Sequence, residues 1–200
     1  MKTIRYIWLG TLLMDNLLPF VLARFYPRFK PKEMALSVLG ARQSPVKGIY
    51  NLWCIVSGAV FCAAPYALYR EARGGLAAAI WLLLAVYGLG CEIISGFCPL
   101  NEDRNEVDTV TKLHGGASAL GFTALLFVPL LLALGQLRSR AVAAGAGTLV
   151  CFLFAFTFFC CFIMGEKERF ADTVLRYGGL WQRLVLASCY VPLAVWCVMG

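Results

Sequence analysis

Six long apolar stretches alternate with short polar segments along this 200-residue chain. A helix needs about 20 mainly apolar residues to cross the hydrocarbon core of a bilayer, and every stretch has close to that length. We therefore predict an all-α fold, an integral membrane bundle of six transmembrane helices, with residues 1–200 forming a single domain. The predicted spans are approximately 6–23, 49–69, 76–97, 114–137, 141–164 and 180–199.

The composition agrees with this pattern. The chain is 60% hydrophobic and 14% charged, and its mean hydropathy is +0.75. A soluble domain usually carries about a quarter charged residues. The net charge of +7 does not indicate nucleic-acid binding, because the basic residues lie in short loops, where they orient the protein and contact lipid headgroups. The predicted partner is the lipid bilayer, and no nucleic acid is expected.

An even number of spans places both termini on the same side of the membrane. The other side, which we call the loop face, comprises the connections near 24–48, 98–113 and 165–179 with the adjoining helix ends. Of the 18 lysines and arginines, six lie on the terminal side and the rest on the loop face. Because cytoplasmic loops carry the excess of basic residues, we predict a cytoplasmic loop face and external termini.

Two acidic residues fall inside predicted spans, where charges are costly and usually face a cavity or a partner. Asp15 precedes Pro19 by four positions, so the proline should free the carbonyl of residue 15 and kink the helix. This site is either functional or a kink whose polar groups bond to neighbouring helices. Glu92 lies one to two turns from the loop face, among glycines at 88, 90 and 96 that allow close helix contact. It is either a site residue, or a side chain that snorkels toward the loop face or pairs with a loop arginine.

Further polar residues gather at the same end of the bundle. Asn51 opens the second span, and His114, the only histidine, opens the fourth with Ser118 one turn later. This convergence with Glu92 predicts a polar pocket at the loop face. Ordinary solvation of membrane loops explains the same pattern without a pocket.

The nine cysteines and the single histidine limit the possible chemistry. Eight cysteines lie in apolar runs, where cysteine behaves as a small hydrophobic residue, and no CxxC or zinc-ligand spacing occurs. One histidine is too few for bis-histidine haem or an intramembrane zinc hydrolase. No nucleotide-binding glycine motif is present in a suitable context. We therefore expect no disulfide framework, no metal site and no cofactor.

Four stretches, taken in order, carry a family resemblance: LSVLGARQSPVKGIYNLWCIVSG (36–58), GLGCEIISGFCPLNED (88–103), KLHGGASALGF (112–122), and GEKERF with GLWQRL (165–184). They resemble the bacterial and archaeal membrane family called domain of unknown function 998. Two departures are Val38, where the family often has an acidic residue, and Cys98, inserted in a loop that often reads F-P-x-D. A more distant likeness is to the eukaryotic six-span group that includes autophagy modulators and a GPI-anchor lipid-remodelling factor.

This resemblance implies a six-helix bundle in a bacterial or archaeal inner membrane, and it supplies no established activity. Its pattern positions are Ser37, Gly40, Pro45, Asn51, Pro99, Asp103, His114, Glu168, Arg169, Trp181 and Arg183. Together with the intramembrane carboxylate, they give the expected ligand-binding set of Ser37, Asn51, Glu92, Asp103, His114, Glu168, Arg169 and Arg183.

We expect the pocket to bind a lipid headgroup or a small polar molecule. Arg169, Arg183 and the basic first loop would hold an anionic headgroup by charge-assisted bonds. One alternative is a lipid-modifying enzyme, with His114 as general base and Asp103 or Glu92 orienting it. Another is a scaffold or regulatory subunit that associates, also with copies of itself, through small-residue helix faces such as Gly145–Gly147.

Overall fold

The computed structural model describes residues 2–72, 74–101 and 108–199. In this part of the chain there is no β-strand, and six helices are long and apolar enough to cross a membrane. Five of them are α1 (Lys2–Ala23), α2 (Lys47–Ala72), α5 (Thr109–Arg138), α6 (Val142–Gly165) and α7 (Gly178–Met199). The remaining span runs through α3 (Gly75–Tyr87), the π-helical segment η2 (Gly88–Ile94) and α4 (Ser95–Phe97). The predicted all-α membrane bundle is confirmed.

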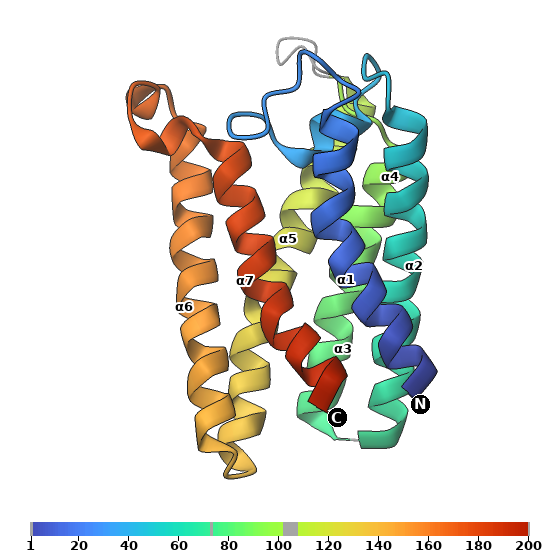
Figure 1. Ribbon diagram of the computed structural model, residues 1–200, viewed down its shortest axis with the longest axis vertical. Helices are drawn as coiled ribbons and strands as arrows, with labels where there is room; N and C mark the ends of the chain where they lie inside the picture. Colours follow the sequence, from blue (N-terminus) through green and yellow to red (C-terminus); the bar gives the residue numbers. More distant parts are fainter. Residues whose placement is uncertain (1, 73, 102–107, 200) are drawn as a thin grey trace.

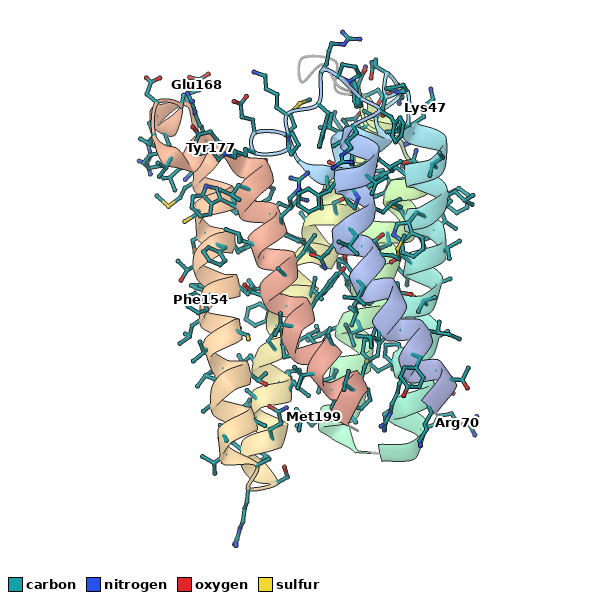
Figure 2. All side chains as sticks on the ribbon, viewed as in Figure 1. Lys47, Arg70, Phe154, Glu168, Tyr177 and Met199 are labelled. Carbon is teal, nitrogen blue, oxygen red and sulfur yellow. The ribbon has the colours of Figure 1, made fainter. Side chains whose placement is uncertain are left out.

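The helices form one bundle with both termini at the same end (Figure 1). The opposite end is the loop face, whose described residues form the short 3-10 helices η1 (Leu36–Gly40), η3 (Glu168–Phe170) and η4 (Val174–Arg176). In Figure 2, Lys47 and Glu168 lie at the loop face, whereas Arg70 lies at the end with the termini. The charged groups labelled there thus stay near the two ends of the bundle.

The outer surface of α6 is apolar. Leu153 and Phe154 are each 55% exposed, and Figure 2 shows Phe154 pointing away from the bundle. The centre of the bundle is formed by α5, whose Leu125 and Val128 are fully buried. Exposed leucine and phenylalanine in this density are suited to lipid, because the bilayer, unlike water, solvates them without cost.

The helix α5 begins five residues before the predicted start of its span. Asp108 is its N-cap, and its carboxylate accepts a hydrogen bond of 2.8 Å from the backbone N–H of Thr111. Such a cap satisfies one of the free N–H groups at a helix start. His114 therefore lies more than one turn inside the helix, rather than at its first residue.

Glycines bring the third span close to its neighbours, as the sequence predicted. A Cβ on Gly58 would lie 2.5 Å from the carbonyl oxygen of Gly88, and one on Gly88 would lie 2.7 Å from that of Gly58. A Cβ on Gly90 would similarly strike the carbonyl of Ala117 in α5. The segment η2 is thus held tightly between α2 and α5, which fixes the position of Glu92.

The glycines of the predicted association face differ from each other. A Cβ on Gly145 would contact Leu137 of the preceding helix, whereas one on Gly147 would meet open space. Gly145 therefore serves packing within the chain. Homo-oligomerisation through this face remains a prediction.

Candidate functional site

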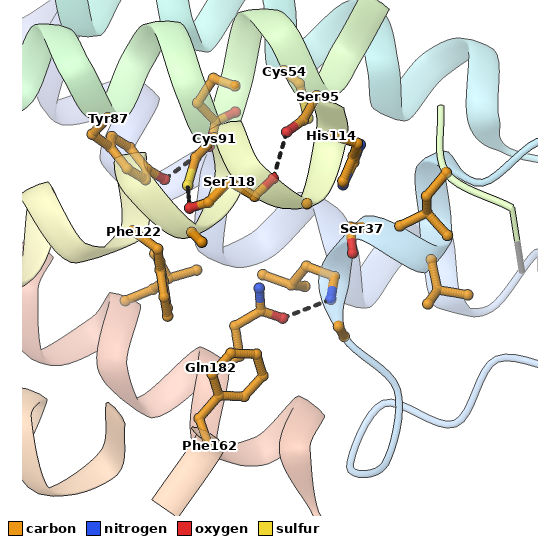
Figure 3. A pocket seen from close by; sticks show the side chains of 18 of the residues that line it. Ser37, Cys54, Tyr87, Cys91, Ser95, His114, Ser118, Phe122, Phe162 and Gln182 are labelled. Carbon is orange, nitrogen blue, oxygen red and sulfur yellow. Dashed lines mark hydrogen bonds between the residues drawn. The ribbon is translucent and has the colours of Figure 1, made fainter. Parts of the chain in front are cut away.

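A cavity of about 780 Å³ lies at the loop-face end of the bundle. Figure 3 shows part of its lining, which comes from η1, α2, the third span, α5, α6 and α7. Its polar lining includes Ser37, Tyr50, Asn51, Tyr87, Glu92, Ser95, Asn101, Thr111, His114, Ser118, Thr123, Glu166 and Gln182. Its aromatic wall is formed by Phe122, Phe159 and Phe162.

One side of α5 forms a long wall of this cavity. Thr111, Gly115, Ala119 and Thr123 recur every four residues and all line it, as expected for one face of a helix. His114 lines it too and is 6% exposed. Its Nδ1 lies 2.8 Å from the carbonyl oxygen of Cys98. Because a carbonyl only accepts, Nδ1 carries the proton.

Serine hydroxyls join the third span to α5 beside the histidine. The Ser95 and Ser118 hydroxyls are 2.7 Å apart and point toward one another in Figure 3. Ser95 also bonds to the carbonyl of Gly90, five residues earlier, at 3.1 Å, and the Cys91 thiol donates to the carbonyl of Ser118. Ser118, expected on the same side as His114, therefore has a structural partner as well as a place in the wall.

Glu92 lines the cavity and is 9% exposed. The Tyr87 hydroxyl lies 2.8 Å from its Oε1, within hydrogen-bond distance. Residues five apart on an α-helix would diverge by roughly 140°, since each residue turns about 100°. The i→i+5 bonding of η2 widens the turn and brings both residues to one side. Within the described residues Glu92 has no arginine partner, contrary to one sequence-based alternative.

Asp15 of α1 is 8% exposed and receives hydrogen bonds from neighbouring helices. The Trp53 Nε1 donates to it at 2.7 Å, and the Ser57 hydroxyl lies 2.9 Å from Oδ1 and 3.0 Å from Oδ2. The Tyr190 hydroxyl donates to Oδ2 at 3.1 Å. Asn16 instead bonds back to the carbonyl of Leu12 in its own helix. Asp15 therefore bonds to side chains of neighbouring helices, whereas the hydrogen bond of Asn16 stays within α1.

The predicted site residues separate into two groups. Ser37, Asn51, Glu92 and His114 line the cavity together. Among them Asn51 also has a structural contact, because its Nδ2 donates to the carbonyl of Gly40 at 3.1 Å. The other group, which does not line the cavity, is Glu168, Arg169 and Arg183. Asp103 lies outside the described residues.

Arg183 fastens the first loop to α7. Its Nη1 donates to the carbonyls of Pro31 and Gly179, both at 2.6 Å. The guanidinium lies 5.6 Å from the ring centre of Phe20 and 5.7 Å from that of Phe29, within the range of cation–π attraction. This arginine therefore has a structural environment away from the cavity.

Glu168 and Arg169 are exposed in η3. The Arg169 guanidinium stacks over the neighbouring Phe170 ring at 4.6 Å. Their sequence pattern is thus located on the outer part of the last loop, and these side chains do not join the polar groups of the cavity.

Gln182 is a cavity residue that the sequence did not single out. Its Oε1 accepts a hydrogen bond of 2.7 Å from the backbone N–H of Leu36, which joins η1 to α7. In the pattern W-x-R this glutamine occupies the variable position between Trp181 and Arg183. The one feature of the sequence that could have indicated this residue is its position directly before Arg183 of the family pattern.

An exposed ion pair at the loop face joins the first loop to the start of α5. Arg42 Nη2 lies 2.6 Å from Asp108 Oδ2. The backbone N–H of Thr111, and then the Arg42 guanidinium, lower the pKa of the Asp108 carboxyl from 3.8 to about 2. The described residues contain no group of three side chains suited to hold a metal ion.

The six long apolar helices define a multi-pass integral membrane protein. Residues 16–199 match the family described as "Protein of unknown function (DUF998)", and the chain belongs to this family. The resemblance to this family that the sequence motifs suggested is thereby confirmed. Neither the curated proteins nor the solved structures include a match to the chain.

Proposed function

We propose that this membrane protein binds the polar head of a lipid, or a small polar molecule, in the cavity at its loop face. The carrying observation is a volume of about 780 Å³ in which hydrogen-bonding side chains face an aromatic wall. Ligand sites typically measure about 300–1,000 Å³ and combine an apolar lining with a few polar groups. Such a mixed lining suits a molecule with one polar and one apolar part.

The charges of the lining favour a particular headgroup chemistry. No lysine or arginine occurs among the described residues that line the cavity, whereas Glu92 and Glu166 do. The anionic headgroup expected from Arg169 and Arg183 would not meet either side chain there. We therefore propose an uncharged or positively charged polar head, held by hydroxyls, amides and carboxyls.

A filled cavity tests this proposal. Gly115 lines the cavity and a Cβ there meets nothing within 4 Å, so Gly115→Leu should occupy the space without a clash. Gly116 has equally open surroundings and is outside the lining, which makes Gly116→Leu a matched control. Native mass spectrometry of the protein, purified with its lipids, should find a ligand in wild type and Gly116→Leu, and lose it in Gly115→Leu. A ligand retained equally in all three, or absent from all three, contradicts the proposal.

The catalytic alternative keeps one supporting observation, since His114 and Glu92 line the same cavity. Their described hydrogen bonds go to Cys98 and Tyr87 and not to each other. If the protein transforms the ligand found above, His114→Ala should abolish turnover while leaving the protein assembled. Turnover that persists in this variant removes His114 as the base.

A further inference from the structure

A continuous line of four buried side chains connects α1 to the cavity. The Tyr190 hydroxyl is 3.1 Å from Asp15 Oδ2, the two tyrosine hydroxyls are 2.5 Å apart, and the Tyr87 hydroxyl is 2.8 Å from Glu92 Oε1. All four side chains are less than a tenth exposed. We call this line the carboxyl–tyrosine chain.

The chain has three contacts, and each hydrogen bond requires one proton. A tyrosine hydroxyl supplies one proton, and an ionised carboxylate supplies none. With both carboxyls ionised, Tyr190 would donate to Asp15 and Tyr87 to Glu92. The two hydroxyl oxygens would then face each other at 2.5 Å without a proton between them. A third proton, carried by one carboxyl, satisfies all three contacts.

The surroundings of the two carboxyls also favour a single charge. In the described part of the chain neither forms an ion pair, and the described ion pairs are Lys30–Glu33 and Arg42–Asp108 in the loops. Unpaired charges inside a membrane are costly, and two like charges near each other add to this cost. Among the described residues, the other titratable groups lining the cavity come from α2, η2, α5 and the C-cap of α6: Tyr50, Cys54, Cys91, His114 and Glu166.

None of these neighbours supplies a fixed counter-charge. Tyrosine and cysteine are normally neutral at pH 7. His114 holds its Nδ1 proton toward the carbonyl of Cys98, and Glu166 is a cavity residue that is exposed to solvent. The third proton therefore has to belong to one of the four side chains of the carboxyl–tyrosine chain.

We propose that Asp15 and Glu92 share one proton through the hydroxyls of Tyr190 and Tyr87, so that the carboxyl–tyrosine chain carries one negative charge in total. Asp15 receives donors from Trp53 and Ser57 in addition to Tyr190. It is therefore the carboxylate at rest, and Glu92 is the protonated acid. In this state Glu92 donates to Tyr87, Tyr87 donates to Tyr190, and Tyr190 donates to Asp15.

The charge can move along the chain with all atoms balanced. The Glu92 O–H bond breaks as its proton bonds to the Tyr87 oxygen, the Tyr87 proton passes to Tyr190, and the Tyr190 proton passes to Asp15 Oδ2. No proton enters or leaves, and the negative charge moves from Asp15 to Glu92. Glu92 lines the cavity and Asp15 does not.

This movement would give the cavity an adjustable charge. A positively charged head in the cavity would attract the negative charge to Glu92 and send the proton to Asp15. That consequence rests on the proposed cavity function. The sharing of one proton does not, because it follows from the three contacts alone.

Infrared spectroscopy of the full-length protein in lipid, at neutral pH and without added ligand, tests the sharing. A protonated carboxyl has a C=O band distinct from that of a carboxylate, and Asp15→Asn/Glu92→Gln provides the baseline without either acid. Wild type should show one such band above this baseline. Asp15→Asn and Glu92→Gln should each lose it, because the new amide N–H supplies the third proton and the remaining carboxyl ionises.

Each other pattern overturns the proposal. No band in wild type means that both groups are ionised, and a band kept in both single variants means that both are protonated. A band lost in only one single variant assigns the proton to that residue alone. If a variant does not fold, wild type labelled with carbon-13 on aspartate or on glutamate carboxyls gives a second reading. The two shifted intensities should add up to one carboxyl, calibrated at low pH, where all 11 acidic side chains are protonated.

Discussion

The hydroxyl oxygens of Tyr87 and Tyr190 lie 2.5 Å apart, although 103 positions separate the two residues in the chain. Tyr87 ends α3 and Tyr190 lies in α7, and both rings pack against Phe61 of α2. Polar contact between the third and the last span is thus embedded in an aromatic cluster. This pairing excludes water, which strengthens the hydrogen bond.

Removing either hydroxyl should destabilise the bundle, because each leaves a buried polar partner unsatisfied. We expect Tyr87→Phe and Tyr190→Phe each to lower the free energy of unfolding by about 1–3 kcal/mol. The double variant should cost less than the two single losses together, by at least about 0.5 kcal/mol. Reversible unfolding in mixed micelles measures all three. Tyr66→Phe, at a 44% exposed tyrosine, is the control, and strictly additive losses would contradict the coupling.

The close approach of α2 and the third span depends on Gly58. A methyl group at Gly58 would lie 2.5 Å from a backbone oxygen, which cannot move aside as a flexible side chain can. Gly58→Ala should therefore lower the free energy of unfolding by about 1–3 kcal/mol. Gly48→Ala lies in the same helix, meets nothing within 4 Å, and should be neutral or slightly stabilising. Equal stability of the two variants would show that the helices can separate without cost.

The contact between Gln182 and Leu36 should hold η1 in place over the cavity. Gln182→Ala removes the acceptor of the Leu36 N–H, so residues 36–40 should exchange their amide hydrogens faster, by about fivefold for a net loss near 1 kcal/mol. Gln182→Glu retains an acceptor oxygen and should preserve most of the protection. Hydrogen exchange followed by mass spectrometry compares the two variants. Unchanged exchange in Gln182→Ala would mean that η1 is held by its other contacts.

The cap of α5 should give the protein a pH dependence in the acid range. The pKa of Asp108 is lowered from 3.8 to about 2, so its carboxylate stabilises the folded protein above pH 3.8. That contribution is lost as the pH falls from about 4 through 2. Asparagine retains capping ability without the charge. The melting temperatures of wild type and Asp108→Asn should therefore differ at pH 5 and converge near pH 2.

Asp172→Asn, in the exposed loop before η4, controls for the general loss of a negative charge. A difference between wild type and Asp108→Asn that stays constant from pH 5 to pH 2 would refute the role of the ionised cap.

The spans were predictable because hydropathy depends on local sequence alone. Glu92 and its glycines also followed from sequence, since small residues beside a buried acid permit close packing. The start of α5 did not follow, because Thr109, Thr111 and Lys112 lower the local hydropathy even though Asp108 caps a helix there. Hydropathy locates the apolar part of a span, whereas a capping residue marks the position at which the helix begins.

The partners of the two buried acids could not be predicted. Tyr87, Tyr190 and Trp53 are ordinary members of apolar spans, and only the tertiary arrangement turns their polar atoms toward a carboxyl. Ser57 lies four residues after Trp53, so the sequence could predict that both side chains lie on one face of their helix. It could not predict that this face is directed toward Asp15. Arg183 illustrates the opposite case, because its charge suggested a ligand and its carbonyl partners are structural.

The π-helical segment Gly88–Ile94 places an extra residue in the third span relative to a regular α-helix. Side chains after this segment are therefore rotated about the helix axis by roughly 100° from the positions that they would have on one regular α-helix. A deletion of Ile93 or Ile94 would restore a regular helix with Tyr87 and Glu92 still five residues apart, and it would leave the hydropathy of the span almost unchanged. It would also rotate Glu92 away from Tyr87. Loss of a residue just after Glu92 would thus separate relatives that can build the carboxyl–tyrosine chain from relatives that merely share its residues.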